Sequence, residues 1–166
     1  VTEAVEDKPT IYCDMDMVLC DFLKGAKEVL GTDFPKADKR TKWPMISAKK
    51  DFWESLEWMP GAKKMWSFIS KYDAHILSAY STKDANSRKG KMNWLRTNAK
   101  LTQKSRIHLV MREDKQKYAM TTDGKPNLLI DDYIKNVNEW KAKGGIGVHH
   151  TSPSDTIAQL KRLGFK

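Results

Sequence analysis

The sequence has few cysteines, no long apolar run and no targeting pattern at its start, and each shortage excludes a class of protein. Only two cysteines, Cys13 and Cys20, occur in 166 residues, too few for the disulfide framework of a small secreted domain. The longest uncharged stretches span about a dozen residues, whereas a membrane helix needs ~20 apolar ones. Residues 1–9 carry three acids and no apolar run, unlike a signal or transit peptide. We therefore expect reduced, unreactive thiols, no membrane partner and a cytoplasmic location.

Acidic residues are also scarce relative to basic ones, which favours anionic ligands. The chain has 30 Lys and Arg against 21 Asp and Glu, a formal charge of +9. Residues 83–106 hold eight of the bases and one acid, Asp84. A helix over residues 84–99 would bury a stripe made of Ala85, Met92, Leu95 and Ala99. The basic residues would then either face solvent or form a surface that binds a polyanion, and the sequence leaves both interpretations open.

Short apolar runs that alternate with helical patterns indicate the fold class. The runs predict buried strands at residues 10–15, 75–79, 107–111, 128–130 and 146–149. Helical spacing and stop signals predict helices at 62–69, at 132–143 and from Ser152 to about Gly164. The residues expected to face inward are Ala62, Met65, Trp66 and Ile69 in the first helix and Ile134, Val137 and Trp140 in the second. This pattern predicts a single α/β domain over residues 1–166, a three-layer Rossmann-like parallel sheet with helices on both faces.

Residues 23–59 interrupt this alternation. They contain no convincing strand but have two prolines, a charged run and several aromatic residues. Because the segment is too short for a core of its own, we expect a small helical cap inserted after the first strand. It would fold over the carboxyl end of that strand, where open α/β sheets bind their ligands.

Two pairs of acids follow two of the predicted strands. Asp14 and Asp16 end the first strand region, and Asp131 and Asp132 follow the run at 128–130. If these strands are neighbours, four carboxylates lie in a small volume, where a cation must neutralise their repulsion. Oxygen ligands without His or Cys suit Mg²⁺ together with a phosphate-bearing substrate.

The spacing of Asp14 and Asp16 has a use in phosphoryl transfer. One carboxylate attacks phosphorus, while the other gives a proton to the leaving oxygen and then activates water. A hydroxyl and a cation must balance the phosphate charge, and Ser78 and Lys115 stand after two other strands. Lys117 is an alternative to Lys115.

In these motifs the chain resembles the haloacid dehalogenase (HAD) superfamily, whose four motifs appear in order over nearly the whole sequence. Asp14-Met15-Asp16, Leu77-Ser78-Ala79, Lys115 and Asp131-Asp132 are similar to motifs one to four. The resemblance implies that Asp14 is the nucleophile and Asp16 the general acid and base. It implies phosphate contacts from Met15, Ser78, Ala79 and Lys115, and Mg²⁺ held by Asp14, Asp16, Asp131 and Asp132.

Within that superfamily, DMDMVLCDF followed by an insertion and LLIDD is most similar to the 5'(3')-deoxyribonucleotidases. This implies hydrolysis of (deoxy)nucleoside monophosphates, with cap aromatics around the base; Phe52, Trp53 and Trp43 are candidates. The chain departs from the family in three ways. Lys115 stands 16 residues before Asp131, a long interval that makes Lys117 the alternative phosphate ligand. Met17 stands where the family usually has Gly, and the insertion is shorter than a full cap.

Two other functions stay open at this point. The same chemistry acting on the 3'-phosphate of a DNA or RNA end would use the basic residues 83–106 to follow the backbone. A phosphate-binding or interaction module with the HAD fold but no turnover is the alternative from another class. The sequence leaves the oligomeric state open.

Overall fold

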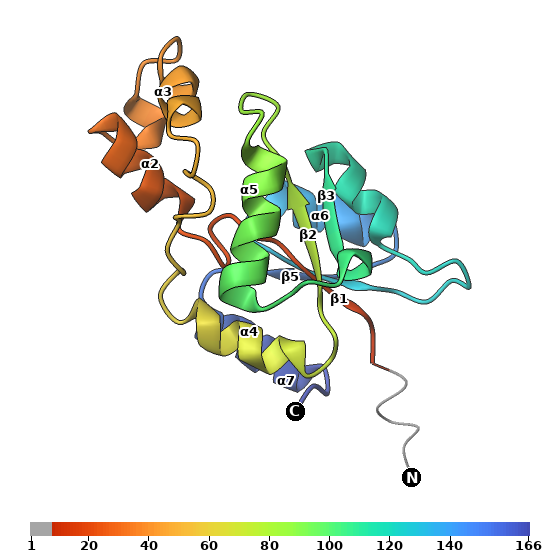
Figure 1. Cartoon of the computed structure of the whole chain (residues 1–166). Helices are drawn as coiled ribbons and strands as arrows, with labels where there is room; N and C mark the ends of the chain where they lie inside the picture. The colour runs from red at the N-terminus through yellow and green to blue at the C-terminus, as the bar shows by residue number, and fades with distance from the viewer. Residues whose placement is uncertain (1–7) are drawn as a thin grey trace.

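The computed structural model describes residues 8–166 and contains one five-stranded sheet (Figure 1). Its strands are β1 (Ile11–Cys13), β2 (His75–Ala79), β3 (Ile107–Val110), β4 (Leu128–Asp131) and β5 (Ile146–His149), in the order β3-β2-β1-β4-β5. All four pairings are parallel, which confirms the predicted sheet and makes β1 and β4 neighbours. Most of residues 1–9, for which no targeting signal is expected, lie outside the described residues.

Helices connect the strands, and most match their predicted positions. They are α2 (Phe22–Leu30), α3 (Lys42–Ala48), α4 (Ala62–Ser70), α5 (Ser87–Trp94), α6 (Ile134–Ala142) and α7 (Pro153–Arg162), with short helical turns η1 (Phe34–Lys36), η2 (Leu95–Ala99), η3 (Lys104–Arg106) and η4 (Arg112–Tyr118). The four inward residues predicted for α4 are all buried. Ser152 caps α7, because its side chain accepts a hydrogen bond from the Asp155 N–H, and Pro153 opens the helix as predicted. No helix in the described part of the chain is long and apolar enough to cross a membrane.

Both faces of the sheet are covered, which gives the predicted three layers. Alternate residues of each strand point to opposite faces. Ile11 and Cys13 join the larger core, in which α4 packs against α7 (Figure 1). Tyr12 contacts the opposite cluster around Trp140 of α6 and Ala119, just after η4.

Three details of the sequence prediction are wrong. Strand β1 ends at Cys13, because the Met15 carbonyl accepts three N–H groups of the following turn. Ile134 is 47% exposed, and the inward face of α6 consists of Asn136, Val137 and Trp140 instead. The stripe predicted for residues 84–99 is right only at its end: Leu95 and Ala99 are buried, but Ala85 is exposed, and the buried face of α5 is Ser87, Gly90, Lys91 and Trp94.

Gly90 explains the inward face of α5. A Cβ at this position would lie 2.5 Å from Trp53 and 2.7 Å from the Glu54 carboxylate, so only glycine lets the inserted segment approach so closely. Asn93, one turn further along, donates a hydrogen bond to Glu54 at 3.2 Å. The helix therefore serves as a support for the insertion.

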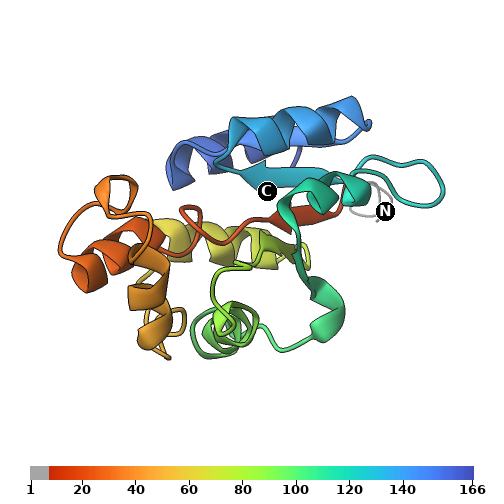
Figure 2. The ribbon, with the colours of Figure 1, turned by 90° about the horizontal axis from the view of Figure 1, so that it is seen from above.

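The insertion between β1 and α4 folds as α2, η1, α3 and an irregular stretch up to Trp58. Its two ends are hydrogen-bonded neighbours, because the Asp21 N–H donates to the Glu57 carbonyl and the Met59 N–H to the Leu19 carbonyl. Seen from above, α2 and α3 lie together at one side of the sheet with α5 next to them (Figure 2). The segment covers the end of the sheet where Asp14 and Asp16 leave β1.

Candidate active site

Three carboxylates meet where β1 and β4 end. Cys13 pairs with Ile130, and the Asp14 N–H donates to the Ile130 carbonyl at 3.0 Å, so the pairing of the strands sets the position of Asp14. Oxygen atoms of Asp14, Asp131 and Asp132 lie within 4.8 Å of one another. The structure thus brings three of the four predicted metal ligands together through their side chains.

Lys115 of η4 lies among these acids. Its Nζ donates to Asp14 Oδ1 at 3.0 Å and to Asp131 Oδ2 at 2.8 Å, and the side chain is only 3% exposed. Burial alone would lower the pKa of Lys115, but the adjacent Asp14 and Asp131 outweigh it and raise this pKa. Lys117, the alternative, is 73% exposed and pairs with Asp114, so Lys115 is the one of the two lysines that lies beside the acids.

The chemistry of this acidic cluster fits a divalent cation. Burial and the charge of Asp14 raise the pKa of Asp131, and burial with Asp14 and Asp131 raises that of Asp132 to about 7. One ammonium group therefore does not compensate three carboxylates. The available ligands are hard oxygen atoms, which match the preference of Mg²⁺.

Asp16 belongs to a second cluster that sequence reasoning missed. Its Oδ2 accepts a hydrogen bond from Lys91 Nζ at 2.8 Å, and the same ammonium group donates to Ser78 Oγ at 3.1 Å. The other carboxylate oxygen, Oδ1, is buried without a hydrogen-bond partner among residues 8–166. Lys91 thus joins the residues of the first two motifs through one buried charge.

Lys91 was expected on the solvated or polyanion-binding face of its helix, yet its side chain is 2% exposed. Its position three residues before Trp94, on the same side of the helix, was the one weak signal in a helix that otherwise has the pattern of a solvated one. In the structure, the Nζ atom also lies 5.1 Å from the centre of the Trp53 ring.

The turn after Asp16 keeps the shape that glycine usually supports. Met17 has φ = 64°, in the left-handed region that costs a residue with a side chain free energy. Its N–H donates to the Cys20 carbonyl at 2.8 Å, which closes the turn. Met17 therefore adopts a backbone conformation that a glycine would adopt without strain.

An aromatic pocket of about 350 Å³ opens beside Asp16. Trp43 and Trp53, two of the predicted base-pocket residues, line it together with Phe22 and Phe34. Trp53 is only 2% exposed, because it stacks on Phe22 with ring centres 5.6 Å apart and on Trp43, so Phe22, Phe34 and Trp43 form the accessible aromatic surface on the side of the insertion. The opposite wall is the chain from Ala79 to Lys83, which directly follows Ser78.

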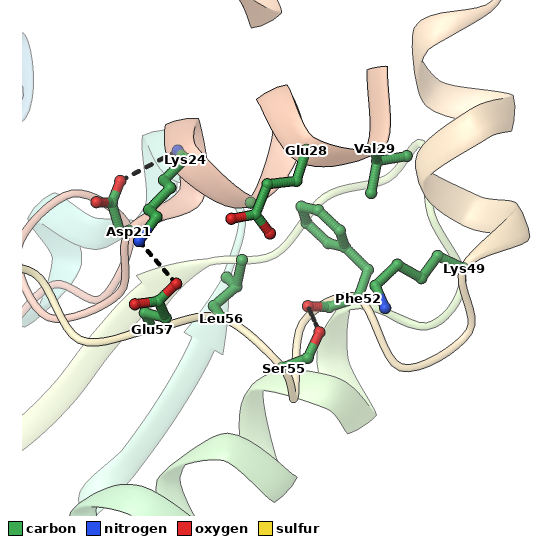
Figure 3. A pocket seen from close by; sticks show the side chains of 10 residues that line it. Asp21, Lys24, Glu28, Val29, Lys49, Phe52, Ser55, Leu56 and Glu57 are labelled. Atoms are coloured by element: carbon green, nitrogen blue, oxygen red, sulfur yellow. Dashed lines mark hydrogen bonds and ion pairs between the residues drawn. The ribbon is translucent and has the colours of Figure 1, made fainter. Parts of the chain in front are cut away.

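Phe52, the third predicted base-pocket residue, lies elsewhere. It is 1% exposed and contributes to a different pocket of about 440 Å³ between α2 and residues 49–57 (Figure 3). That pocket contains none of the residues of the four motifs, and Asp21, Lys24 and Glu57 form a hydrogen-bonded chain at its edge. Successive residues of this segment thus face opposite sides of it.

Asp84 holds the aromatic wall in place. It is 2% exposed and accepts hydrogen bonds from Trp53 Nε1 at 2.8 Å and Ser47 Oγ at 2.9 Å, both in the insertion. Burial would raise the pKa of Asp84, but hydrogen bonds from Asn86 and Trp53 outweigh it and lower this pKa. The chain between Ser78 and Lys91 therefore also positions Trp53.

The cysteines and histidines contribute no side-chain atom to these clusters; among the histidines, His149 contacts only the backbone of one member, with Nε2 3.0 Å from the Asp132 carbonyl oxygen. Burial raises the pKa of both Cys13 and Cys20, which keeps them as thiols. His150 bonds to Thr156 Oγ1, while His75 and His108 bond to each other across β2 and β3 at 3.0 Å.

Comparison with known proteins identifies the fold. No protein-family model and no curated protein matches the sequence. Solved structures do: a hydrolase from Streptococcus pneumoniae TIGR4 has a TM-score of 0.55 at 11% identity, covering 95% of this chain and 98% of its own. A Thermotoga maritima protein assigned as a beta-phosphoglucomutase has a TM-score of 0.53 at 16% identity, covering 94% and 100%.

A third similar structure is a HAD family hydrolase from Deinococcus radiodurans R1 with bound phosphate and sodium, with a TM-score of 0.50 at 13% identity, covering 95% of this chain and 89% of that one. Together these similarities show that the chain has the fold of HAD-type hydrolases.

Proposed function

We propose that the protein is a Mg²⁺-dependent phosphomonoesterase that acts through an aspartyl-phosphate and that its substrates are nucleoside monophosphates. One observation carries the proposal. Two buried lysines each bind one aspartate of the Asp14-Met15-Asp16 motif, Lys115 on Asp14 and Lys91 on Asp16, with Ser78 on the same lysine. This arrangement combines a nucleophile, a proton donor and two fixed cations, as transfer of a phosphoryl group requires.

In the proposed reaction, an Asp14 oxygen attacks phosphorus and the bond to the leaving oxygen breaks. Asp16 gives its proton to that oxygen, and the alcohol leaves. Asp16 then takes a proton from water as the resulting hydroxide attacks the aspartyl-phosphate, which releases inorganic phosphate and restores both aspartates. Ser78, Lys91 and Lys115 stabilise the negative charge on the phosphoryl oxygens.

The carboxylates of Asp14, Asp131 and Asp132 are the residues that would hold Mg²⁺, with Asp16 beside them. A bound Mg²⁺ supplies positive charge for the phosphate oxygens and lowers the repulsion between them and Asp14. The neighbour from Deinococcus radiodurans R1 has bound phosphate, which supports a phosphate ligand here as well.

The aromatic pocket supports a nucleoside as the alcohol. Phe22, Phe34 and Trp43 are partly exposed in this pocket next to Asp16, whereas Trp53 is 2% exposed and stacks on Phe22 and Trp43. The partly exposed rings are the ones on which the flat π face of a nucleobase would stack. A small alkyl phosphate would leave this surface exposed to water.

Phosphate release from a panel of nucleoside 5'- and 3'-monophosphates tests the proposal. We expect turnover with Mg²⁺, none with chelator and none with Asp14→Asn, which keeps the shape of the side chain and removes its charge. Lys63→Gln, an exposed lysine of α4, is a matched control and should retain full activity. Equal release by the wild type and Asp14→Asn would refute the proposal.

A further inference from the structure

The positive charge of the chain is concentrated in two segments that are distant in sequence. Residues 34–50 carry six Lys and Arg against one acid, and residues 80–91 carry four against one. Their net charge of +8 accounts for almost all of the +9 of the whole protein. In the rest of the chain, which includes residues 92–106, basic and acidic residues nearly balance, with a net charge of +1.

The structure brings these two segments together over the aromatic pocket. Phe34 and Trp43 of the first segment and Tyr80 to Lys83 of the second line opposite walls of it. The Ser47–Asp84 hydrogen bond connects the segments directly. Of the basic residues in these segments, Lys83 lines the pocket beside Asp16, and Arg88 lies over Tyr80, another residue of its wall.

Two basic residues at this pocket, Lys83 and Arg88, have no acidic partner in the described part of the chain, unlike Lys91, which pairs with Asp16. Among the described residues, Lys83 and Arg88 form no ion pair, and the Arg88 guanidinium instead lies over the Tyr80 ring at 4.5 Å. Asp84, the one acid of this segment, is buried and its carboxylate accepts hydrogen bonds from Trp53 and Ser47. Lys83 in the wall of the pocket and Arg88 beside its Tyr80 would attract an anionic group of a ligand.

We propose that Lys83 and Arg88 form a subsite for a second phosphate, so that the preferred substrate is a nucleoside that carries a further phosphate besides the one removed. This inference rests on the proposed function, because Asp14 and Asp16 define where the first phosphate binds. Tyr80 supports the subsite by holding the Arg88 guanidinium. Two ligands share this chemistry, a nucleoside bisphosphate and the phosphorylated end of a nucleic acid strand.

Binding of a fluorescein-labelled four-residue oligothymidylate with a 3'-phosphate tests the subsite. Anisotropy is measured in EDTA, where no phosphate is released, and thymidine 3'-monophosphate and thymidine 3',5'-bisphosphate serve as competitors. We expect the bisphosphate to compete at least tenfold better than the monophosphate. Two contacted phosphates also predict that Kd rises about tenfold when salt increases fivefold, since each contributes a slope of about 0.7 for single strands.

Charge removal then assigns the effect to the subsite. Lys83→Gln/Arg88→Gln should raise Kd for the oligonucleotide about tenfold and flatten its salt dependence, whereas Lys63→Gln/Lys143→Gln, equal in charge but distant from the pocket, should change Kd less than twofold. An oligonucleotide that binds better than the bisphosphate identifies a nucleic acid end as the ligand, and equal binding identifies the small bisphosphate.

Two results would overturn the subsite: a monophosphate that competes as well as the bisphosphate, or a double variant that behaves like its control. Hydrolysis of p-nitrophenyl phosphate with Mg²⁺, measured on the same preparations, reports the proposed function separately. Its presence with either of these results refutes only the subsite, and its absence refutes the enzymatic proposal.

Discussion

Replacing Lys91 by methionine tests the least expected part of the site. Lys91→Met keeps an unbranched side chain of similar length but removes the ammonium group that joins Asp16 and Ser78. The chain contains a matched control in Lys63→Met, because Lys63 is also a helical lysine but is exposed on α4. A difference between the two variants therefore reports the location of the charge.

The structure sets the expected magnitudes. Removing one partner of a buried ion pair costs about 3–5 kcal/mol of stability, but the Asp16 side chain is 32% exposed and water compensates part of its charge. We therefore expect a loss of about 2 kcal/mol in the free energy of unfolding. Removing one preorganised donor from an anionic transition state lowers the rate about 10²–10³-fold, and we expect a loss of this size in kcat/KM.

Urea unfolding measures the first quantity, and release of p-nitrophenolate from p-nitrophenyl phosphate measures the second. This substrate has no base or second phosphate, so it isolates the effect on the reacting group. Retention of more than a third of the wild-type kcat/KM by a folded Lys91→Met protein would refute the role given to Lys91.

Three further predictions concern stability and binding. Met17→Val should lower the free energy of unfolding by about 2 kcal/mol in urea, since a β-branched residue fits poorly at a positive φ, while Met17→Gly should not lower it. Asp84→Ala should cost about 2–3 kcal/mol in the same assay, because Trp53 and Ser47 lose a buried acceptor, and should raise KM for nucleotides more than for p-nitrophenyl phosphate. Burial and the neighbouring His108 lower the pKa of His75 to about 4, so on acidification the unfolded chain takes up a proton at this residue before the folded chain does. The free energy of unfolding should therefore fall by about 1 kcal/mol between pH 6.5 and pH 4, a value reduced to allow for solvent screening of the half-buried ring.

Controls separate these effects from general damage to the fold. Asp84→Asn retains an acceptor for Trp53 and should lose less stability than the alanine variant; equal losses would contradict the role of the hydrogen bonds. His75→Gln removes the titrating ring, so its unfolding free energy should vary less between pH 6.5 and 4 than that of the wild type. An unaltered pH dependence in His75→Gln would exclude this histidine as the cause.

The sheet could be predicted from sequence because its strands are apolar throughout. The runs at His75–Ala79 and Ile146–His149 match the observed bounds, since turn residues and glycines flank them clearly. The end of β1 could not be predicted, because the apolar Met15 looks like a strand residue while its carbonyl serves the following turn. The hydrogen bonds of the turn end β1 at Cys13, two residues before the last apolar residue of the run, Met15.

The candidate site was only partly predictable. Asp14, Ser78, Lys115 and Asp131 stand at strand ends or just beyond them, and parallel pairing brings them to one edge. Lys91 could not be found in this way, since a lysine within a basic helix has the sequence pattern of a solvated residue. Only the tertiary packing of α5 under the insertion, with Asp16 as the partner, makes its burial possible.

The adjoining ends of the insertion bear on how such a protein can diversify. Because Asp21 bonds to Glu57 and Met59 to Leu19, the segment leaves and re-enters the sheet at one place, and the strands need no adjustment to its length. The entropic cost of closing a loop at this position rises only slowly with the length of the loop. Evolution can therefore exchange this segment as a unit, altering which molecule is accepted while the reaction chemistry is inherited unchanged. A new segment would have to supply hydrogen-bond donors for the buried Asp84 carboxylate in place of Trp53 and Ser47.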